Sequence, residues 1–134
     1  MRRERIDWWL AVIVLGHLAI TMAHGAAHQS AHVPIAWWAQ LFVLIVIVVA
    51  PIAGLVLSLR SPRIGTALVA AAMAGSLVFG LVNHFLIVSP DHVQEVAAAS
   101  RPLFATTAVL LVLSEAAGAV LALRRLLRPL EARQ

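Results

Sequence analysis

Four long apolar stretches, separated by short polar connectors, account for most of the chain. They cover about residues 8–29, 35–59, 64–88 and 103–123. Each stretch is close to the roughly 20 apolar residues that an α-helix needs to cross a bilayer core of about 30 Å. The pattern therefore predicts an all-α integral membrane protein, a four-transmembrane-helix bundle in which residues 1–134 form a single membrane domain.

Two prolines affect the second and third stretches: one lies in the connector between them, and one lies inside the second stretch. The connector between them, Arg60 to Arg63, contains Pro62 and is only four residues long, which predicts a tight helical hairpin. Pro51 lies inside the second stretch. A proline there is expected to kink the helix and to free backbone carbonyls toward the core.

The two halves of the chain resemble each other, which suggests a tandem repeat of two helical hairpins. A shift of 60 residues aligns His24 with His84 and His32 with His92. A shift of 64 aligns a second set, in which Ala53, Gly54, Val56, Leu57, Leu59 and Arg60 correspond to Ala117, Gly118, Val120, Leu121, Leu123 and Arg124. Two hairpins of equal orientation would be related by an axis along the membrane normal.

The composition supports a protein that has lipid as its solvent. Of 134 residues, 62% are hydrophobic and 12% are charged, too apolar for a soluble domain of this length. Cysteine is absent, which excludes disulfides, thiolate metal sites and cysteine nucleophiles. The sequence also contains no phosphate-binding glycine loop, no Gly-x-Ser-x-Gly elbow and no HExxH pair. These absences leave open whether the protein is an enzyme.

The arginines predict the orientation of the bundle. All ten basic residues are arginines, and nine of them flank the apolar stretches on one side, at positions 2, 3, 5, 60, 63, 124, 125, 128 and 133. Only Arg101 falls on the other side. By the positive-inside rule, we expect a multi-pass protein of the cell membrane, the inner membrane in a bacterium, with both termini cytoplasmic (N-in/C-in). Basic residues placed as topology signals give no reason to expect nucleic acid as a partner.

Histidines form a stripe on the first predicted helix. His17, Thr21, His24 and His28 follow each other at spacings of four, three and four, which places them on one narrow helix face. Such groups could merely form hydrogen bonds with neighbouring helices. Several ionisable groups on one stripe within a membrane span instead favour a ligand or proton role. His84 lies at nearly the depth of His24, so the two are expected to face one another.

Glu115 is the one carboxylate within a predicted span, near the membrane midplane and at a depth similar to that of His17. Because an acid in lipid either becomes neutral or finds a partner, we expect these two residues to interact. The pair would act as a structural hydrogen bond, a proton relay or an inner metal site.

The connector before the fourth span carries three further candidates. Asp91, His92 and Glu95 follow Ser89 and Pro90, a sequence that begins like a short helix with serine as N-cap. The two carboxylates and the imidazole could receive a cation at the periphery. Acidic residues in a first turn also favour the helix dipole, and that interpretation is preferred here.

The leading functional hypothesis is a small membrane protein that binds a transition metal (copper, zinc or iron) near the outer face through His24, His28 and His84. Imidazole is a suitable ligand for all three metals. The alternative is a heme b protein with His24 and His84 as axial ligands and Arg101 near the propionates. A third hypothesis is a non-catalytic subunit or assembly factor of a larger membrane complex. A transporter is a less favoured variant: it would be a homo-oligomer such as a homodimer, in which Glu115 and His17 carry protons inward.

Overall fold

A computed structural model gives the fold and describes residues 8–127. Within this range every regular element is helical: α1 (Trp8–Ala31), α2 (Trp37–Phe42), η1 (Val43–Val49), α3 (Ala50–Ser58), α4 (Pro62–Leu81), η2 (Val82–Leu86) and α5 (Arg101–Leu127). The labels η1 and η2 denote segments of π-helix. Arginines 2, 3, 5, 128 and 133, on which the predicted orientation partly depends, lie outside the described residues.

Four continuous helices are long and apolar enough to cross a membrane: Trp8–Ala31, Trp37–Ser58, Pro62–Leu86 and Arg101–Leu127. They agree with the four predicted stretches to within a few residues. The all-helical class and the number of candidate spans are therefore confirmed. The repeat of hairpins stays a prediction.

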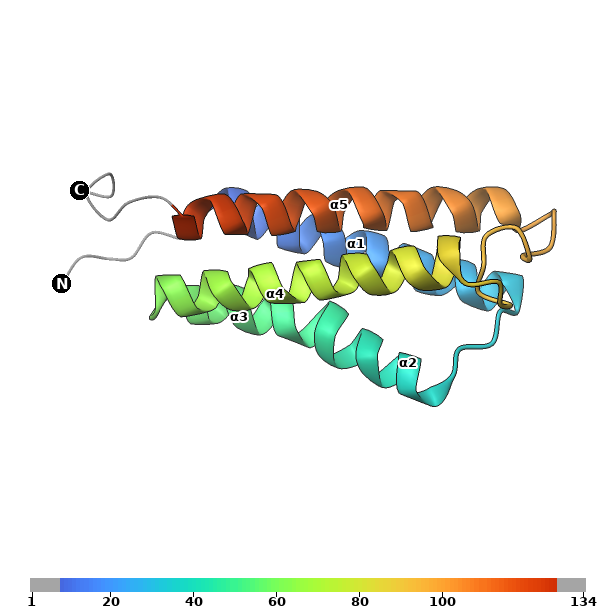
Figure 1. The fold of residues 1–134 in the computed structure, drawn as a ribbon, viewed down its shortest axis with the longest axis horizontal. Helices are drawn as coiled ribbons and strands as arrows, with labels where there is room; N and C mark the ends of the chain where they lie inside the picture. The colour runs from blue at the N-terminus through green and yellow to red at the C-terminus, as the bar shows by residue number, and fades with distance from the viewer. Residues whose placement is uncertain (1–7, 128–134) are drawn as a thin grey trace.

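α5 has two neighbours in the bundle. It contacts both α1 and α4 along its length, and α3 packs on the other side of α4. The order around the bundle is thus α1, α5, α4 and α3, with α1 and α4 on a diagonal. In Figure 1, α2 leans away from the other helices toward the end of the molecule that carries the connectors after α1 and before α5. This end is called the outer end below.

The second span is not a uniform α-helix. It changes from α-helix to π-helix at Val43 and returns to α-helix at Ala50, one residue before Pro51. Proline has no backbone N–H, so the carbonyl four residues earlier, that of Ile47, loses its normal partner. In the π-helical turn the Ala50 N–H bonds to the carbonyl of Ile45, five residues back. The predicted distortion is present, and it takes the form of a π-helical segment.

The turn between α3 and α4 is the predicted tight hairpin. α3 ends at Ser58, and α4 begins with Pro62 in its first turn after Ser61. The two helices approach so closely that a β-carbon at Gly54 would lie 2.9 Å from the carbonyl oxygen of Gly65. Only glycine fits there, which fixes how these helices cross.

The surface of the bundle is largely apolar. Large exposed hydrophobic side chains are found on all four candidate spans, the distribution typical of helices that face lipid. Tryptophans are exposed at both ends, with Trp8 and Trp9 at the start of α1 and Trp37 and Trp38 at the start of α2. This placement matches the aromatic belts of membrane proteins.

The described arginines divide between the two ends of the bundle. Arg60 and Arg63 lie at the hairpin turn, and Arg124 and Arg125 lie in the last turns of α5, at the same end as the start of α1 (Figure 1). Arg101 begins α5 at the outer end. Its guanidinium donates hydrogen bonds to the carbonyls of Val96 (3.1 Å) and Gln94 (2.9 Å), so it fixes the loop instead of being free for a propionate.

The loop of residues 87–100 corrects one prediction. It contains turns and bends and no helix, although Ser89 Oγ does accept a bond from the Asp91 N–H (3.3 Å). The helix does not continue because the chain turns back over the bundle, where the Val93 N–H bonds to the His84 carbonyl (3.0 Å). Helix capping is therefore not the role of Asp91.

Candidate metal centre

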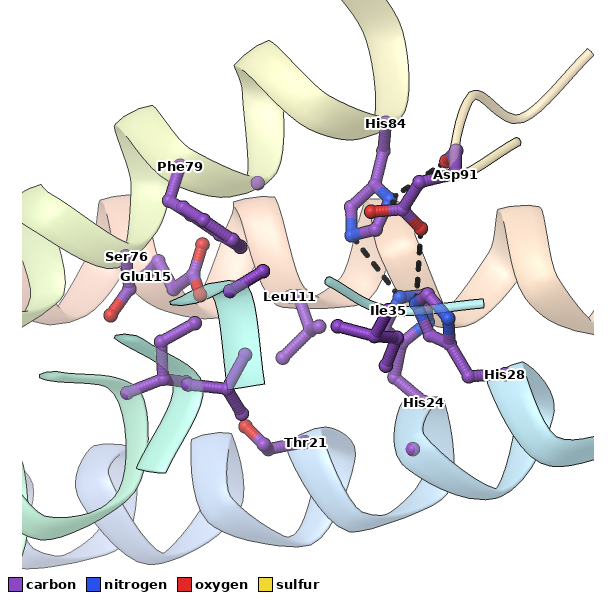
Figure 2. Close-up of a pocket in the computed structure, with 15 residues that line it drawn as sticks. Thr21, His24, His28, Ile35, Ser76, Phe79, His84, Asp91, Leu111 and Glu115 are labelled. Atoms are coloured by element: carbon purple, nitrogen blue, oxygen red, sulfur yellow. Dashed lines mark hydrogen bonds and ion pairs between the residues drawn. The ribbon is translucent and has the colours of Figure 1, made fainter. Parts of the chain in front are cut away.

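Three buried histidines meet at the outer end of the bundle. His24 and His28 come from successive turns of α1, and His84 comes from η2 on the diagonally opposite span. Each offers a ring nitrogen, and these nitrogens lie within 4.8 Å of one another, close enough to hold a metal ion (Figure 2). The predicted proximity of His24 and His84 is present. The ligand role of the three side chains remains a proposal.

A hydrogen bond from α5 sets the orientation of His24. Its Nδ1 lies 2.8 Å from Oγ1 of Thr107. The threonine hydroxyl already donates to the carbonyls of Leu103 (2.9 Å) and Phe104 (3.0 Å). Because its single proton is engaged, Oγ1 accepts from His24, which must carry its proton on Nδ1. The Nε2 lone pair of His24 is then available to a ligand.

The outer loop orients His84 in the same way. Its Nδ1 lies 3.1 Å from the backbone carbonyl of Asp91 and 3.3 Å from Oδ1 of the same residue. The backbone carbonyl can only accept a hydrogen bond, so His84 also carries a proton on Nδ1, and the nearby Oδ1 favours the same placement. The ring is presented by a π-helical turn, an irregularity often found at functional sites.

The two unprotonated nitrogens face each other. Nε2 of His24 and Nε2 of His84 are 3.2 Å apart in a buried environment. Two lone pairs at this distance repel unless a proton or a metal ion lies between or beside them. Two ligands of one tetrahedral zinc ion, at about 2.0 to 2.1 Å from the metal, are about 3.4 Å apart. The observed separation is thus close to that of a pair of metal ligands.

His28 and Asp91 complete one side of the cluster. Nε2 of His28 lies 3.2 Å from Oδ1 of Asp91, the oxygen that also approaches His84. Nδ1 of His28 is buried and has no hydrogen-bond partner among the described residues. The ring therefore has an unused ligand atom. A carboxylate beside three imidazoles also supplies a negative charge that a divalent cation requires.

No protein family, curated protein or solved structure matches this chain. Its function therefore has to be inferred from the arrangement of its own side chains.

An apolar wall on the α5 side borders the site. The ring of Phe104 lies 4.8 Å from that of His24, 4.7 Å from that of His28 and 5.5 Å from that of His84. Phe104 packs with Ala27 and Val96 in a buried cluster. Such a wall limits the access of water and holds the imidazoles in place, as hydrophobic surroundings do at metal sites.

The structure separates the other polar candidates of the loops from this cluster. His92 uses both ring nitrogens locally, because Nε2 lies 3.3 Å from the Phe85 carbonyl and Nδ1 accepts from the Gln94 N–H (3.2 Å). Glu95 and His32 are exposed. His32 has a positive φ of 55° at the end of α1, a position in which a helix commonly terminates.

His17 and Glu115 lie deeper in the bundle, and both are fully buried. Nδ1 of His17 is 4.0 Å from Oε1 of Glu115, so the two side chains approach each other as expected but are too far apart for a hydrogen bond. Nε2 of His17 donates instead to the Ile47 carbonyl (3.3 Å), whose usual α-helical donor is the N–H that Pro51 lacks.

Three side chains of the site were not recognised from the sequence as its components. The roles of Thr107 and Phe104 were missed, and Asp91 was assigned to the periphery. Thr107 had a detectable signal, because it lies eight residues before Glu115 and hence on the same face of α5. The return of Asp91 to the bundle depends on loop conformation, for which the sequence has no periodic signal.

Proposed function

We propose that this protein is a small integral membrane protein, with both termini in the cytoplasm, that binds a divalent transition metal ion (copper, zinc or iron) near its outer face. His24, His28 and His84 would be the ligands, with Asp91 available as a fourth. Three neutral imidazoles and a carboxylate are a donor set that suits these metals. The observation that carries the proposal is the 3.2 Å separation of the Nε2 atoms of His24 and His84, whose Nδ1 atoms are both engaged elsewhere.

Support for the membrane location comes from four apolar helices and from the exposed apolar surface. Support for the orientation comes from the division of the arginines between the two ends. The outer end would then be the external face, and the metal site would lie just inside it.

The geometry favours a bare metal ion over heme. Axial imidazoles on opposite faces of a heme place their nitrogens about 4 Å apart, twice a metal–nitrogen bond of about 2.0 Å, with the porphyrin between them. The Nε2 atoms of His24 and His84 are only 3.2 Å apart, and Phe104 and His28 flank them. This arrangement leaves no room for a macrocycle between the two rings.

The test is elemental analysis and an optical spectrum of the protein purified in detergent. We expect one of the three metals, or stoichiometric uptake of added Zn²⁺, and no heme absorption. The His24→Ala, His84→Ala double variant should lose this binding. A matched control is His32→Asn, which removes an exposed histidine and keeps a residue type that tolerates positive φ. Equal metal content in the wild type and the double variant would overturn the proposal and favour the role of a non-catalytic subunit in a larger membrane complex.

A further inference from the structure

The histidine cluster and Glu115 line the same cavity. The cavity has a volume of about 80 Å³ and extends from His24, His28, His84 and Asp91 to Glu115 (Figure 2). Its walls between these groups are mainly apolar and come from α1, the second span, α4 and α5. A space of this size holds several water molecules. The outer site is therefore connected to the centre of the bundle.

Glu115 has an oxygen atom that no protein group satisfies. The side chain is 1% exposed, and Oε2 has no hydrogen-bond partner within residues 8–127. Within the described residues, the ionisable group within 4.0 Å of Oε1 is His17, through its Nδ1. An ionised carboxylate without partners is costly at this depth in a membrane span, so Glu115 either becomes neutral or binds a cation.

His17 presents an acceptor to Glu115, although its side chain is not among those that line the cavity. Its Nε2 donates to the Ile47 carbonyl, so Nδ1 carries the lone pair. The nearest hydroxyl to Nδ1, Ser114 Oγ at 3.5 Å, donates its proton to the Leu111 carbonyl (2.9 Å). Nδ1 therefore receives no strong hydrogen bond. A carboxylate oxygen and an unprotonated imidazole nitrogen facing each other across 4.0 Å are two potential ligands of a divalent transition metal.

The charges in the cavity also favour a cation near Glu115. A divalent ion bound by three neutral imidazoles and the Asp91 carboxylate would keep one net positive charge in an apolar bundle. Glu115 carries the other carboxylate that lines the cavity. An ion that moves inward would thus leave one carboxylate and approach a second.

We propose that Glu115 and His17 form a second, inner cation site, which receives the divalent metal ion from the outer histidine site through the shared cavity. Water molecules in the cavity would complete the coordination of the ion. This inference rests on the proposed function, because the outer site supplies the ion. It adds a path by which the metal reaches the centre of the membrane.

Gly80 lines this path beside Glu115. A β-carbon added at Gly80 would lie 3.6 Å from Oε2 of Glu115, an ordinary contact distance. Alanine therefore fits at this position, whereas leucine would extend further into the cavity beside Glu115. The two substitutions form a matched pair that separates an effect of volume from an effect of losing glycine in α4.

The experiment is equilibrium dialysis of the full-length protein in detergent against excess Zn²⁺, with bound zinc counted by elemental analysis. The wild type should bind about two zinc ions per chain. Glu115→Gln, which keeps the shape of the side chain, should reduce this to about one, and Gly80→Leu should do the same. Gly80→Ala and Glu95→Gln, a change at an exposed carboxylate in the loop, should retain about two.

Different outcomes separate the two proposals. One zinc ion in the wild type that Glu115→Gln leaves in place would overturn the inner site and leave the outer one intact. Binding that survives in the His24→Ala, His84→Ala double variant but is lost in Glu115→Gln would overturn the outer site instead. Helix content by circular dichroism checks that each variant is folded. If Glu115→Gln fails to fold, equal zinc binding by Gly80→Leu and Gly80→Ala overturns the inner site.

Discussion

His17 donates a hydrogen bond from Nε2 to the backbone carbonyl of Ile47, 3.3 Å away on the second span. Ile47 is four residues before Pro51, which has no N–H to occupy this carbonyl. One buried histidine thus donates to a backbone carbonyl that has lost its usual donor to a proline on another helix. The same bond sets the tautomer of His17 and turns its Nδ1 toward Glu115.

This relationship predicts coupling between positions 17 and 51. His17→Ala should destabilise the bundle by about 1 to 3 kcal/mol, because it leaves the Ile47 carbonyl buried and unpaired. In a Pro51→Ala background the restored N–H can bond to that carbonyl, so the same change should cost less. We expect an interaction energy of about 0.5 to 2 kcal/mol in a double-mutant cycle measured by unfolding in detergent. Additive effects would show that the two residues act independently.

Thr107 is expected to tune the outer site without touching the metal. Thr107→Val keeps the shape of the side chain but removes the acceptor for His24 Nδ1. Zinc affinity should fall by about 10-fold to 100-fold, as is usual when a partner that orients a histidine ligand is lost. Thr106→Val, at an exposed position on the same helix, is the matched control and should bind as the wild type does. Competition with a zinc-sensitive dye would measure both affinities.

Asp91 should contribute through its charge. Asp91→Asn retains the backbone carbonyl that orients His84 and removes the negative charge of Oδ1 next to His28 and His84. Zinc binding should weaken by at least about 10-fold. The isosteric control is Glu95→Gln in the same loop. Unchanged affinity in Asp91→Asn would restrict Asp91 to a role in loop structure.

Periodicity in the sequence predicted much of this structure, since helices impose it. The spacing of His17, His24 and His28 indicated one helix face, and all three side chains are buried on α1. The matched depths of His24 and His84 indicated their proximity, because apolar length measures position along the membrane normal. Likewise, the similar depths of His17 and Glu115 indicated their approach across the core.

Features that depend on irregular backbone were not predicted. Asp91 reaches the histidines because residues 87–100 turn back over the bundle, a path set by contacts such as that of Arg101 with the Gln94 carbonyl. The helix expected after Ser89 did not form for the same reason. The π-helical turn that presents His84 also follows no sequence rule, since it contains neither proline nor glycine.

The orientation of the bundle can be tested with single introduced cysteines, because the sequence contains none of its own. Four arginines of the described chain lie at the end with the hairpin turn and the end of α5, and only Arg101 lies at the other. The positive-inside rule then places the loop with Ala98 outside and Gln134 inside. A maleimide that cannot cross membranes should label the Ala98→Cys variant in intact cells, since Ala98 is exposed. The Gln134→Cys variant should react only after lysis. The reverse pattern would turn the histidine site toward the cytoplasm, so that the metal would enter from inside the cell.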